Sequence, residues 1–273
     1  MRLTRFLDPA GQEHHGHDRG DGTAELLSGD LFFGLSLTGA TATIHQRLAP
    51  LRPVNLFCIG KNYAAHAKET GSDAPESPIV FMKPTSAVTD PDHPILIPHV
   101  CQDGTEVDYE AELAVVIGRV VRDVPQAEAL DYVFGYTCAN DISARKWQLE
   151  GGGGQWIRGK GFDTFCPLGP VLVTADEIPD PQNLAVKLIL NGEMMQCGVT
   201  SDMIFTVAKL ISFLSRDTTL LPGTVILTGT PAGVGFTREP PVYLKDGDQV
   251  VVEIEGIGRL SNPVLSWMRE DGG

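Results

Sequence analysis

The chain of 273 residues is long enough to bury a sizeable hydrophobic core, either as one large domain or as a domain with a small lobe. Its hydrophobic fraction of 42% and charged fraction of 21% are typical of globular proteins and argue against disorder. The formal net charge of −14 argues against a nucleic-acid partner and against attachment to an anionic membrane. No apolar run approaches the roughly 18–20 residues that a membrane span needs.

The N-terminal segment and the cysteines indicate a cytoplasmic location. MRLTRFLDPAG lacks the apolar core of a signal peptide and is not the Arg/Ser-rich, acid-poor stretch of a transit peptide. The five cysteines are scattered and contain no C-x-x-C pair. This usage is typical of reduced, mostly buried thiols.

Residues 1–50 are predicted to form a small N-terminal lobe, and residues 51–273 the main domain. The lobe begins with a strand signal in MRLTRF and has weaker strand signals in LFFGLSL and ATIHQRL. EHHGHD, residues 13–18, is the densest histidine cluster of the chain. We interpret it as a polar, solvated turn, with a transition-metal site as the alternative.

From LFCIG onward, strand signals are dense and helices are few. Asn191-Gly192 and Asp246-Gly247 lie between apolar runs and are expected to form hairpin turns. Helices are expected in NYAAHAKE, PQAEALDY, DISARKWQ and DMIFTVAKLISFLSR, the last of which has apolar residues at helical spacing. Because strands outnumber helices and do not alternate with them regularly, the sequence predicts a β-rich, mixed α+β fold.

VDYEAELAVVIG, residues 107–118, has the pattern of one buried strand that starts with three carboxylates. Alternation puts Asp108, Glu110 and Glu112 on one face, which turns apolar after Glu112. Like charges at this spacing repel, and each costs several kcal/mol to desolvate without a partner. A cation is therefore expected opposite them, and a strand end exposed to water is the alternative.

Asp141, in CANDISARK, follows another strand signal and is expected to open a helix. Together with Glu110 and Glu112 it would offer three carboxylates with no nearby His or Cys. Such a set favours a hard divalent cation, Mg²⁺ first and Mn²⁺ or Ca²⁺ next. The alternative role for Asp141 is a helix N-cap.

His66 and Glu69 lie three residues apart in the helix expected within NYAAHAKE, so they share one face. A carboxylate that holds an imidazole fixes its tautomer and raises its basicity, as a general base requires. An ordinary surface pair is the alternative. The polar segment TGSDAPESP follows, and such a loop beside a helix is typical of a closing lid.

Two glycine-rich segments offer sites for a small anion. GGGGQWIRGKG, residues 151–161, is close to a phosphate-binding loop, but Gly161 stands where Ser or Thr is needed, so we reject a nucleotide site. Lys160 can still approach a small anion or lie in a surface turn. In ILTGTPAGVG, residues 226–235, a strand runs into a turn whose N–H groups and Thr228 and Thr230 hydroxyls could hold a carboxylate. An ordinary tight turn is the alternative.

Six segments, in this order, resemble the fumarylacetoacetate hydrolase family: CIGKNYAAHAKE, PIVFMKP, DYEAELAVVIG, YTCANDISARKWQ, GKGFDTFCPLGP and ILTGTPAGVG. The resemblance covers residues from about 54 to 266. GKGFDTFCPLGP and PPVYLKDGDQVVVEIEGIG are especially similar to the domain-containing branch that also exists in animals.

The resemblance implies a β-sandwich-like or roll-like catalytic domain with a small N-terminal lobe, in a homodimer. It implies Mg²⁺ or Mn²⁺ as the metal, with Ca²⁺ as an ion that a crystal could hold, and a small 2-oxo acid or its enol as the substrate. The implied site residues are His66, Glu69 and Lys160 for catalysis, Arg145, Gln148 and Thr230 for substrate binding, and Glu110, Glu112 and Asp141 for the metal.

The first functional expectation is a divalent-metal-dependent hydrolase that cleaves a C–C bond in 2,4-dioxo acids, of the acylpyruvate or fumarylpyruvate type, through a metal-bound enolate. The same constellation also serves oxaloacetate tautomerases and decarboxylases and hydroxymuconate-type diacid isomerases, which stay open as alternatives. A metal-stabilised 2-oxo acid sensor without turnover is a further alternative. From their position alone, the loops at 70–77 and 149–158 are expected to set substrate choice.

Overall fold

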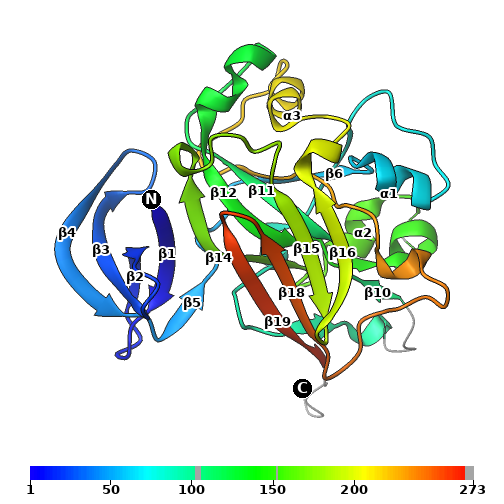
Figure 1. Ribbon diagram of the computed structural model, residues 1–273, viewed down its shortest axis with the longest axis horizontal. Coiled ribbons are helices and arrows are strands. Elements are labelled where there is room, and N and C mark those ends of the chain that lie inside the picture. The colour runs from blue at the N-terminus through cyan, green and yellow to red at the C-terminus, as the bar shows by residue number, and fades with distance from the viewer. Residues whose placement is uncertain (102–105, 152, 268–273) are drawn as a thin grey trace.

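Two β-sheets packed face to face form the body of the protein, as a computed structural model shows for residues 1–101, 106–151 and 153–267 (Figure 1). The larger sheet has twelve strands in the described part of the chain, and the smaller has five. Three central strands of the larger sheet, β11 (Ala111–Ile117), β12 (Val133–Asn140) and β14 (Cys166–Thr174), contact β15, β18 and β19 of the smaller one. The β-rich fold with few helices that the sequence predicts is confirmed.

The larger sheet has the order β4-β3-β2-β1-β14-β12-β11-β17-β6-β7, with β5 beside β1 and β8 beside β14. Its other strands are β1 (Arg2–Leu7), β2 (Glu13–Asp18), β3 (Thr23–Asp30), β4 (Gly34–Thr43), β5 (Gln46–Leu48), β6 (Leu56–Gly60), β7 (Ile79–Met82), β8 (Val88–Thr89) and β17 (Val225–Leu227). The smaller sheet has the order β16-β15-β18-β19-β9. Its strands are β9 (Ile95–Ile97), β15 (Ala185–Leu190), β16 (Glu193–Val199), β18 (Gln249–Ile254) and β19 (Gly258–Ser266).

Helices are short and lie at the edges of the two sheets (Figure 1). The α-helices are α1 (Ala64–Glu69), α2 (Trp156–Lys160) and α3 (Val207–Leu214), and one π-helical turn is η4 (Trp147–Gly151). The short 3₁₀ turns are η1 (Thr85–Ala87), η2 (His99–Cys101), η3 (Gln126–Tyr132), η5 (Ala175–Glu177), η6 (Thr200–Asp202) and η7 (Gly235–Thr237). A separate two-stranded ladder joins β10 (Val107–Asp108) to β13 (Ser143–Ala144).

Strand β11 is buried on both faces, and this explains why its N-terminal carboxylates are also buried. Every residue of Ala111–Ile117 is buried. Leu113 and Val115 belong to the core cluster between the two sheets, whereas Ala114 and Val116 belong to a second cluster on the opposite face of the larger sheet. A strand covered on both sides carries apolar residues at almost every position. Polar groups at its start are therefore held inside the protein.

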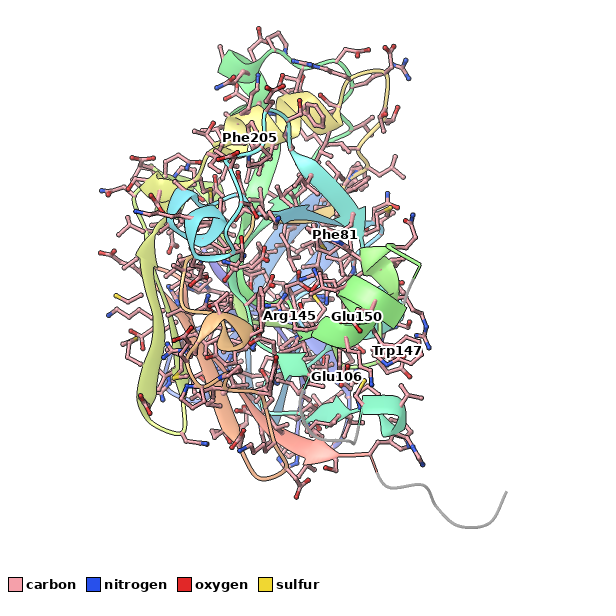
Figure 2. The ribbon with its side chains drawn as sticks, turned by 90° about the vertical axis from the view of Figure 1, so that its right-hand side faces the viewer. Phe81, Glu106, Arg145, Trp147, Glu150 and Phe205 are labelled. Atoms are coloured by element: carbon pink, nitrogen blue, oxygen red, sulfur yellow. The ribbon has the colours of Figure 1, made fainter. Side chains whose placement is uncertain are left out.

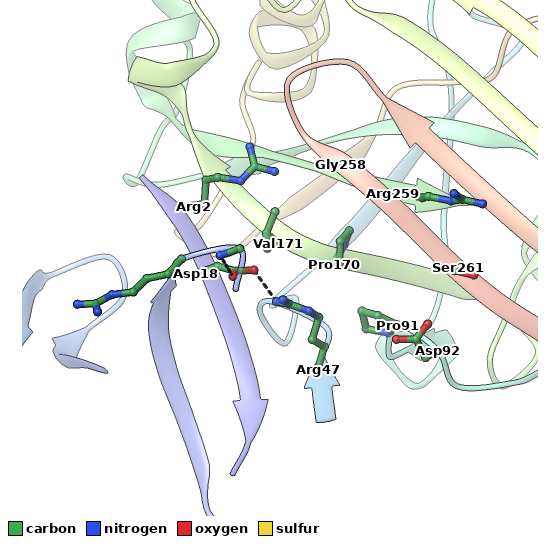
Figure 3. Close-up of a pocket in the computed structure, with 12 residues that line it drawn as sticks. Arg2, Asp18, Arg47, Pro91, Asp92, Pro170, Val171, Gly258, Arg259 and Ser261 are labelled. Atoms are coloured by element: carbon green, nitrogen blue, oxygen red, sulfur yellow. Dashed lines mark hydrogen bonds and ion pairs between the residues drawn. The ribbon is translucent and has the colours of Figure 1, made fainter. Parts of the chain in front are cut away.

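The N-terminal strands β1 to β5 lie to one side of the main body, at the left of Figure 1. Strand β1 pairs with β14, with Arg2 opposite Val173, so the sheet continues from these strands into the main body. A cleft of about 370 Å³ lies along this junction and is lined by arginines that include Arg2 and Arg259 (Figure 3). In the cleft, Arg47 donates to Asp18 Oδ2 at 2.6 Å, which ties β5 to β2.

EHHGHD forms strand β2, so the prediction of a polar turn is wrong. The strand pairs with β1 from Leu3 opposite His17 to Leu7 opposite Glu13. A ring nitrogen of His14 lies 3.0 Å from Asp8 Oδ2. The pairing with β1 supplies the backbone hydrogen bonds that define this strand, and a polar composition gives no local sign of such a partner.

Three further expectations change in the structure. The run at 107–118 is two strands, β10 and β11, with a break at Tyr109 and Glu110. DISARKWQ is helical only in its second half, because Ser143–Ala144 pair with β10 and helical structure begins at Arg145 and continues into the π-helical turn from Trp147. Asp141 therefore does not cap a helix. The segment PQAEALDY is helical, but of the 3₁₀ type.

The expected helix at 202–216 is confirmed over a shorter range, since α3 begins after Thr206, whose side chain accepts from Lys209 N–H. Asn191 and Gly192 both have positive φ and join β15 to β16 as the predicted hairpin. Gly247 also has a positive φ, but no strand of the described chain immediately precedes its turn, so Asp246-Gly247 does not join a hairpin.

We predict that native protein reacts with iodoacetamide at one thiol. Cys197 is exposed, whereas the other four cysteines are buried. Burial raises the pKa of Cys138 and that of Cys166 to about 12, so little of the reactive thiolate forms at mildly alkaline pH. Mass spectrometry should find a single label, absent in Cys197→Ser, and labels on all five cysteines in guanidinium chloride. Rapid labelling of native Cys197→Ser would contradict the buried positions.

Candidate active site

Two neighbouring strands bring three carboxylates together. Glu110 lies in the break before β11, Glu112 lies in β11, and Asp141 follows β12. The register places Ala111 opposite Asn140, and Asp141 N–H donates to the Glu110 carbonyl at 2.8 Å. One oxygen from each of the three carboxylates lies within 4.8 Å of the other two, and all three residues are buried. The predicted metal-ligand set is therefore a single cluster.

Two buried lysines contact this cluster. Lys160 Nζ lies 3.1 Å from Glu110 Oε2 and 2.7 Å from Asp141 Oδ2. Burial disfavours the charged ammonium, but Asp141 and Glu110 outweigh this effect and raise the pKa of Lys160. Lys83 Nζ lies 2.6 Å from Asp141 Oδ1 and donates to the carbonyls of Ile142 and Phe165.

Lys83 is a site residue that the sequence analysis did not single out, although it lies in the segment PIVFMKP. A lysine that follows a short apolar strand is ordinarily taken for a solvated strand end. Here it is 2% exposed, and its ammonium group contacts three backbone carbonyls, those of Ile142, Lys160 and Phe165, and the Asp141 carboxylate. Nothing local in the sequence indicates these distant acceptors.

The two glutamates of the cluster have opposite electrostatic surroundings. Burial opposes ionisation of Glu110, but Lys160 and Arg145 lower its pKa to about 2. Burial and the nearby charges of Asp141 and Glu110 raise the pKa of Glu112 well above its usual range. Glu112 accepts a hydrogen bond from Gly229 N–H, and it forms no ion pair with any described residue.

The residues present fit a divalent cation. Around the start of β11, four buried carboxylates face three buried cations. The carboxylates belong to Asp108, Glu110, Glu112 and Asp141, and the cations to Lys83, Arg145 and Lys160. Of these four carboxylates, that of Glu112 has no cationic partner among the described residues. A cluster of oxygen donors with excess negative charge suits a hard cation such as Mg²⁺ or Mn²⁺.

Arg145 is fixed from several sides. Its Nε donates to Asp108 Oδ2 at 2.8 Å, and its Nη1 lies 2.7 Å from Glu110 Oε1 and 3.0 Å from Gln148 Oε1. Asp108 in turn accepts from the N–H groups of Gly235 and Phe236. Arg145 and the η4 turn lie on the same side of the molecule in Figure 2. The guanidinium is therefore held rigidly where it borders the cavity.

His66 and Glu69 form the expected pair, with Nδ1 2.7 Å from Oε1. The pair is not an ordinary surface contact, because His66 is buried and Glu69 is held by a second element. Glu69 Oε2 accepts from Gly233 N–H at 2.9 Å and lies 3.3 Å from Thr237 Oγ1. A carboxylate at Nδ1 places the proton there and leaves the lone pair on Nε2, as a general base requires.

A cavity of about 220 Å³ joins these groups. Its polar floor includes Glu110, Arg145 and Lys160. Of the two loops that were expected to set substrate choice, 149–158 contributes Leu149 and Trp156 to the wall, and 70–77 contributes Thr70. Of the 149–158 loop, Gly152 lies outside the described residues. The cavity is lined by Ile59, Gly60, Lys61, His66, Thr70, Glu110, Arg145, Gln148, Leu149, Trp156, Lys160, Thr230 and Phe236.

Two adjacent residues explain the shape of the cavity wall. A Cβ at Gly60 would lie 2.3 Å from the Trp156 ring, so only glycine allows this indole to approach. Lys61 has a φ of 53°, a conformation that non-glycine residues seldom adopt. Its Nζ donates to Ser72 Oγ at 2.7 Å. The sequence analysis did not identify Lys61 as a site residue.

Known proteins are similar to this chain in sequence and in fold. Residues 55–265 match the family model described as fumarylacetoacetate (FAA) hydrolase C-terminal. The mitochondrial oxaloacetate tautomerase fahd2 of Xenopus laevis is 49% identical over 219 residues, which make up 80% of this chain and 68% of that protein.

Solved structures give the same result. The 5-carboxymethyl-2-hydroxymuconate delta-isomerase from Mycobacterium smegmatis is 41% identical, with a TM-score of 0.85 over 98% of this chain and 100% of that one. The fumarylacetoacetate hydrolase from Exiguobacterium antarcticum is 39% identical, with a TM-score of 0.86 over the same shares. The fold and the site thus define a β-rich enzyme with a cluster of three buried carboxylates. The chain belongs to the fumarylacetoacetate hydrolase family.

None of the helices in the described ranges is both long enough and apolar enough to cross a membrane.

We predict that Glu112→Gln weakens Mn²⁺ binding by more than about tenfold, since even outer partners of metal ligands matter by about 10–100-fold. Because the pKa of Glu112 is raised, a proton competes with the cation there. Wild-type affinity should therefore fall as the pH falls through this raised pKa. Calorimetric titration measures both effects, and the exposed Glu150→Gln variant is the matched control. Equal affinities for the two variants would exclude Glu112 as a ligand.

Proposed function

We propose that the protein converts a small 2-oxo dicarboxylic acid between its keto and enol forms, with oxaloacetate as the substrate and a divalent cation as the cofactor. The observation that carries this proposal is the set of residues that line one small cavity. The buried base His66 and three cationic side chains, Lys61, Arg145 and Lys160, border the same space beside the carboxylate cluster. The oxaloacetate tautomerase name of the Xenopus laevis relative supports the same substrate.

A cation held by Glu110, Glu112 and Asp141 would supply a Lewis acid that stabilises negative charge on the 2-oxo oxygen. His66, oriented by Glu69, removes a proton from the carbon next to the carbonyl. Lys160 adds positive charge on the side where the enolate develops. Protonation of the 2-oxo oxygen then completes the enol. A C–H bond breaks, an O–H bond forms and the double bond moves from C=O to C=C, so the proton that His66 removes balances the one that the oxygen gains.

Three further residues would bind the substrate. Arg145 is held by Asp108 and Gln148, and its guanidinium borders the cavity at the Phe236 ring. Gln148 is buried at the same wall. Thr230 also lines the cavity and would bind a substrate carboxylate. These assignments keep the roles that the family resemblance implies.

Lys61 favours a dicarboxylic acid over a monocarboxylic one. Its hydrogen-bond partner is the neutral Ser72, and no carboxylate among the described residues pairs with it. Non-glycine residues with a positive φ carry strain and are concentrated at functional sites. An uncompensated ammonium in such a conformation, bordering the cavity, suits the second carboxylate of the substrate.

C–C hydrolysis of 2,4-dioxo acids, the first expectation from the sequence, stays as a second candidate. The similarity to the structure named fumarylacetoacetate hydrolase favours it, and the His66–Glu69 pair could equally activate water.

We also propose Mg²⁺ as the physiological metal, a cytoplasmic location, a homodimer and a lobe boundary at residue 50. The free thiols support the location, and exposed apolar side chains such as Phe33 and Val54 support the dimer.

The activity is tested by NMR on oxaloacetate, acetylpyruvate and fumarylpyruvate, each with Mg²⁺ or with EDTA. We expect metal-dependent equilibration of keto and enol oxaloacetate without a broken C–C bond. His66→Asn should lower the rate by about 10²–10⁴-fold while Mn²⁺ binding is kept. His99→Asn, at an exposed site, is the control. Release of pyruvate and a second acid from acetylpyruvate would move the assignment to the hydrolase.

Lys61→Met is expected to raise the KM for oxaloacetate by about 10–100-fold, as the loss of one charge-assisted hydrogen bond predicts. The enolisation of pyruvate, which has one carboxylate, should change little. Lys68→Met, on the exposed face of α1, is the matched control. Steady-state kinetics on both substrates measure the effect. A similar loss on both would show that Lys61 does not select the second carboxylate.

A further inference from the structure

Gln196, in β16, links the metal-ligand strand to the turn that carries Thr230. It is 1% exposed. Its Oε1 accepts from Ala111 N–H at 2.9 Å, and Ala111 lies between Glu110 and Glu112. Its Nε2 donates to Thr230 Oγ1 at 2.8 Å and to the Pro231 carbonyl at 2.7 Å. It lies in none of the sequence segments that indicate a site.

The orientation of the Gln196 amide is determined by its partners. A backbone N–H can only donate, and a backbone carbonyl can only accept. Ala111 N–H therefore requires the oxygen of the amide on its side, and the Pro231 carbonyl requires the nitrogen on the other. If the amide were turned over, both backbone contacts would be lost.

This orientation fixes the hydrogen-bonding role of Thr230. A hydroxyl has one proton, and Thr230 Oγ1 already accepts from Gln196 Nε2. The Thr230 proton must therefore point away from Gln196, and it is donated to no acceptor among the described residues. Because Thr230 borders the cavity, its proton is free for an anionic ligand there.

The packing of β16 against the turn makes this link rigid. A Cβ at Gly198 would lie 2.5 Å from Pro231 Cβ, and a Cβ at Gly233 would lie 2.3 Å from the Met195 carbonyl. Both glycines thus allow the strand and the turn to approach more closely than side chains permit. The position of Thr230 relative to the carboxylate cluster is set through Gln196 and these contacts.

We propose that Gln196 is a positioning residue that makes Thr230 an obligatory hydrogen-bond donor to the substrate carboxylate. The inference rests on the proposed role of Thr230 in substrate binding. Gln196 itself lies behind Thr230 and acts through it. Its effect should therefore vanish when the Thr230 hydroxyl is removed.

The test is a double-mutant cycle of Gln196→Met and Thr230→Val. Alone, Gln196→Met should raise the KM for oxaloacetate by about tenfold and change kcat by less than about threefold, since one oriented hydrogen bond is lost. In the Thr230→Val background, it should change KM by less than about twofold. Independent, multiplying effects would overturn the proposal, because they would show a general structural role.

A binding measurement without turnover distinguishes a failure of the proposed function from a failure of the proposed role of Gln196. The affinity for oxalate in the presence of Mn²⁺, measured by calorimetry, should show the same coupling without any turnover. If wild-type protein is inactive with oxaloacetate but the oxalate cycle shows coupling, the proposed function fails and the role of Gln196 stands. If the enzyme is active but neither cycle shows coupling, the role of Gln196 fails.

Further variants serve as controls. Should Gln196→Met unfold, Gln196→Glu replaces it, because its carboxylate still accepts from Ala111 N–H but cannot donate to Thr230. That variant should weaken oxalate binding by at least about tenfold, and wild-type affinity would contradict the proposal. Thr230→Ser should retain wild-type affinity, since it keeps the hydroxyl. Gln126→Met, at an exposed site in η3, should leave all parameters unchanged.

Discussion

Repulsion among buried carboxylates at the start of β11 is the constraint on which the other parts of the site depend. The strand is covered on both faces, and Glu110 and Glu112 are both buried. Lys83, Arg145 and Lys160 offset most of this charge, and each is itself held by oxygen acceptors. An isolated buried charge costs several kcal/mol, so this arrangement is tolerable only with nearly complete pairing. The residual negative charge gives the site its need for a cation.

One turn, residues 229–237, holds the groups around this cluster in place. Its N–H groups donate to three carboxylates. Glu112 belongs to the carboxylate cluster, Glu69 pairs with His66, and Asp108 holds Arg145. A segment that presents its backbone so closely needs glycine, and Gly229 and Gly233 both have positive φ. The glycine-rich composition of ILTGTPAGVG thus reflects dense backbone contacts to carboxylates. It does not by itself mark a binding loop.

The names of similar proteins include a tautomerase, an isomerase and a hydrolase. A general base beside a Lewis acid can serve each of these three kinds of reaction. The choice among them depends on the second end of the substrate and on whether water can enter. In this chain Lys61 and the Trp156 ring both border the cavity. The two differ in chemistry, since one is a cation and the other is an apolar surface.

The sequence by itself determined the β-rich fold, the Asn191-Gly192 hairpin and the identity of the carboxylate cluster, because apolar alternation and turn residues are local signals. Only the tertiary structure decided the strand at EHHGHD, the break at Glu110 and the contacts of Lys83 and Gln196. Each of these depends on a partner far away in the chain, such as β1 for EHHGHD or Asp141 for Lys83. A local sequence pattern indicates which side of a helix or strand is buried. It does not indicate which polar group contacts that element, because the contact forms only when the sheets pack.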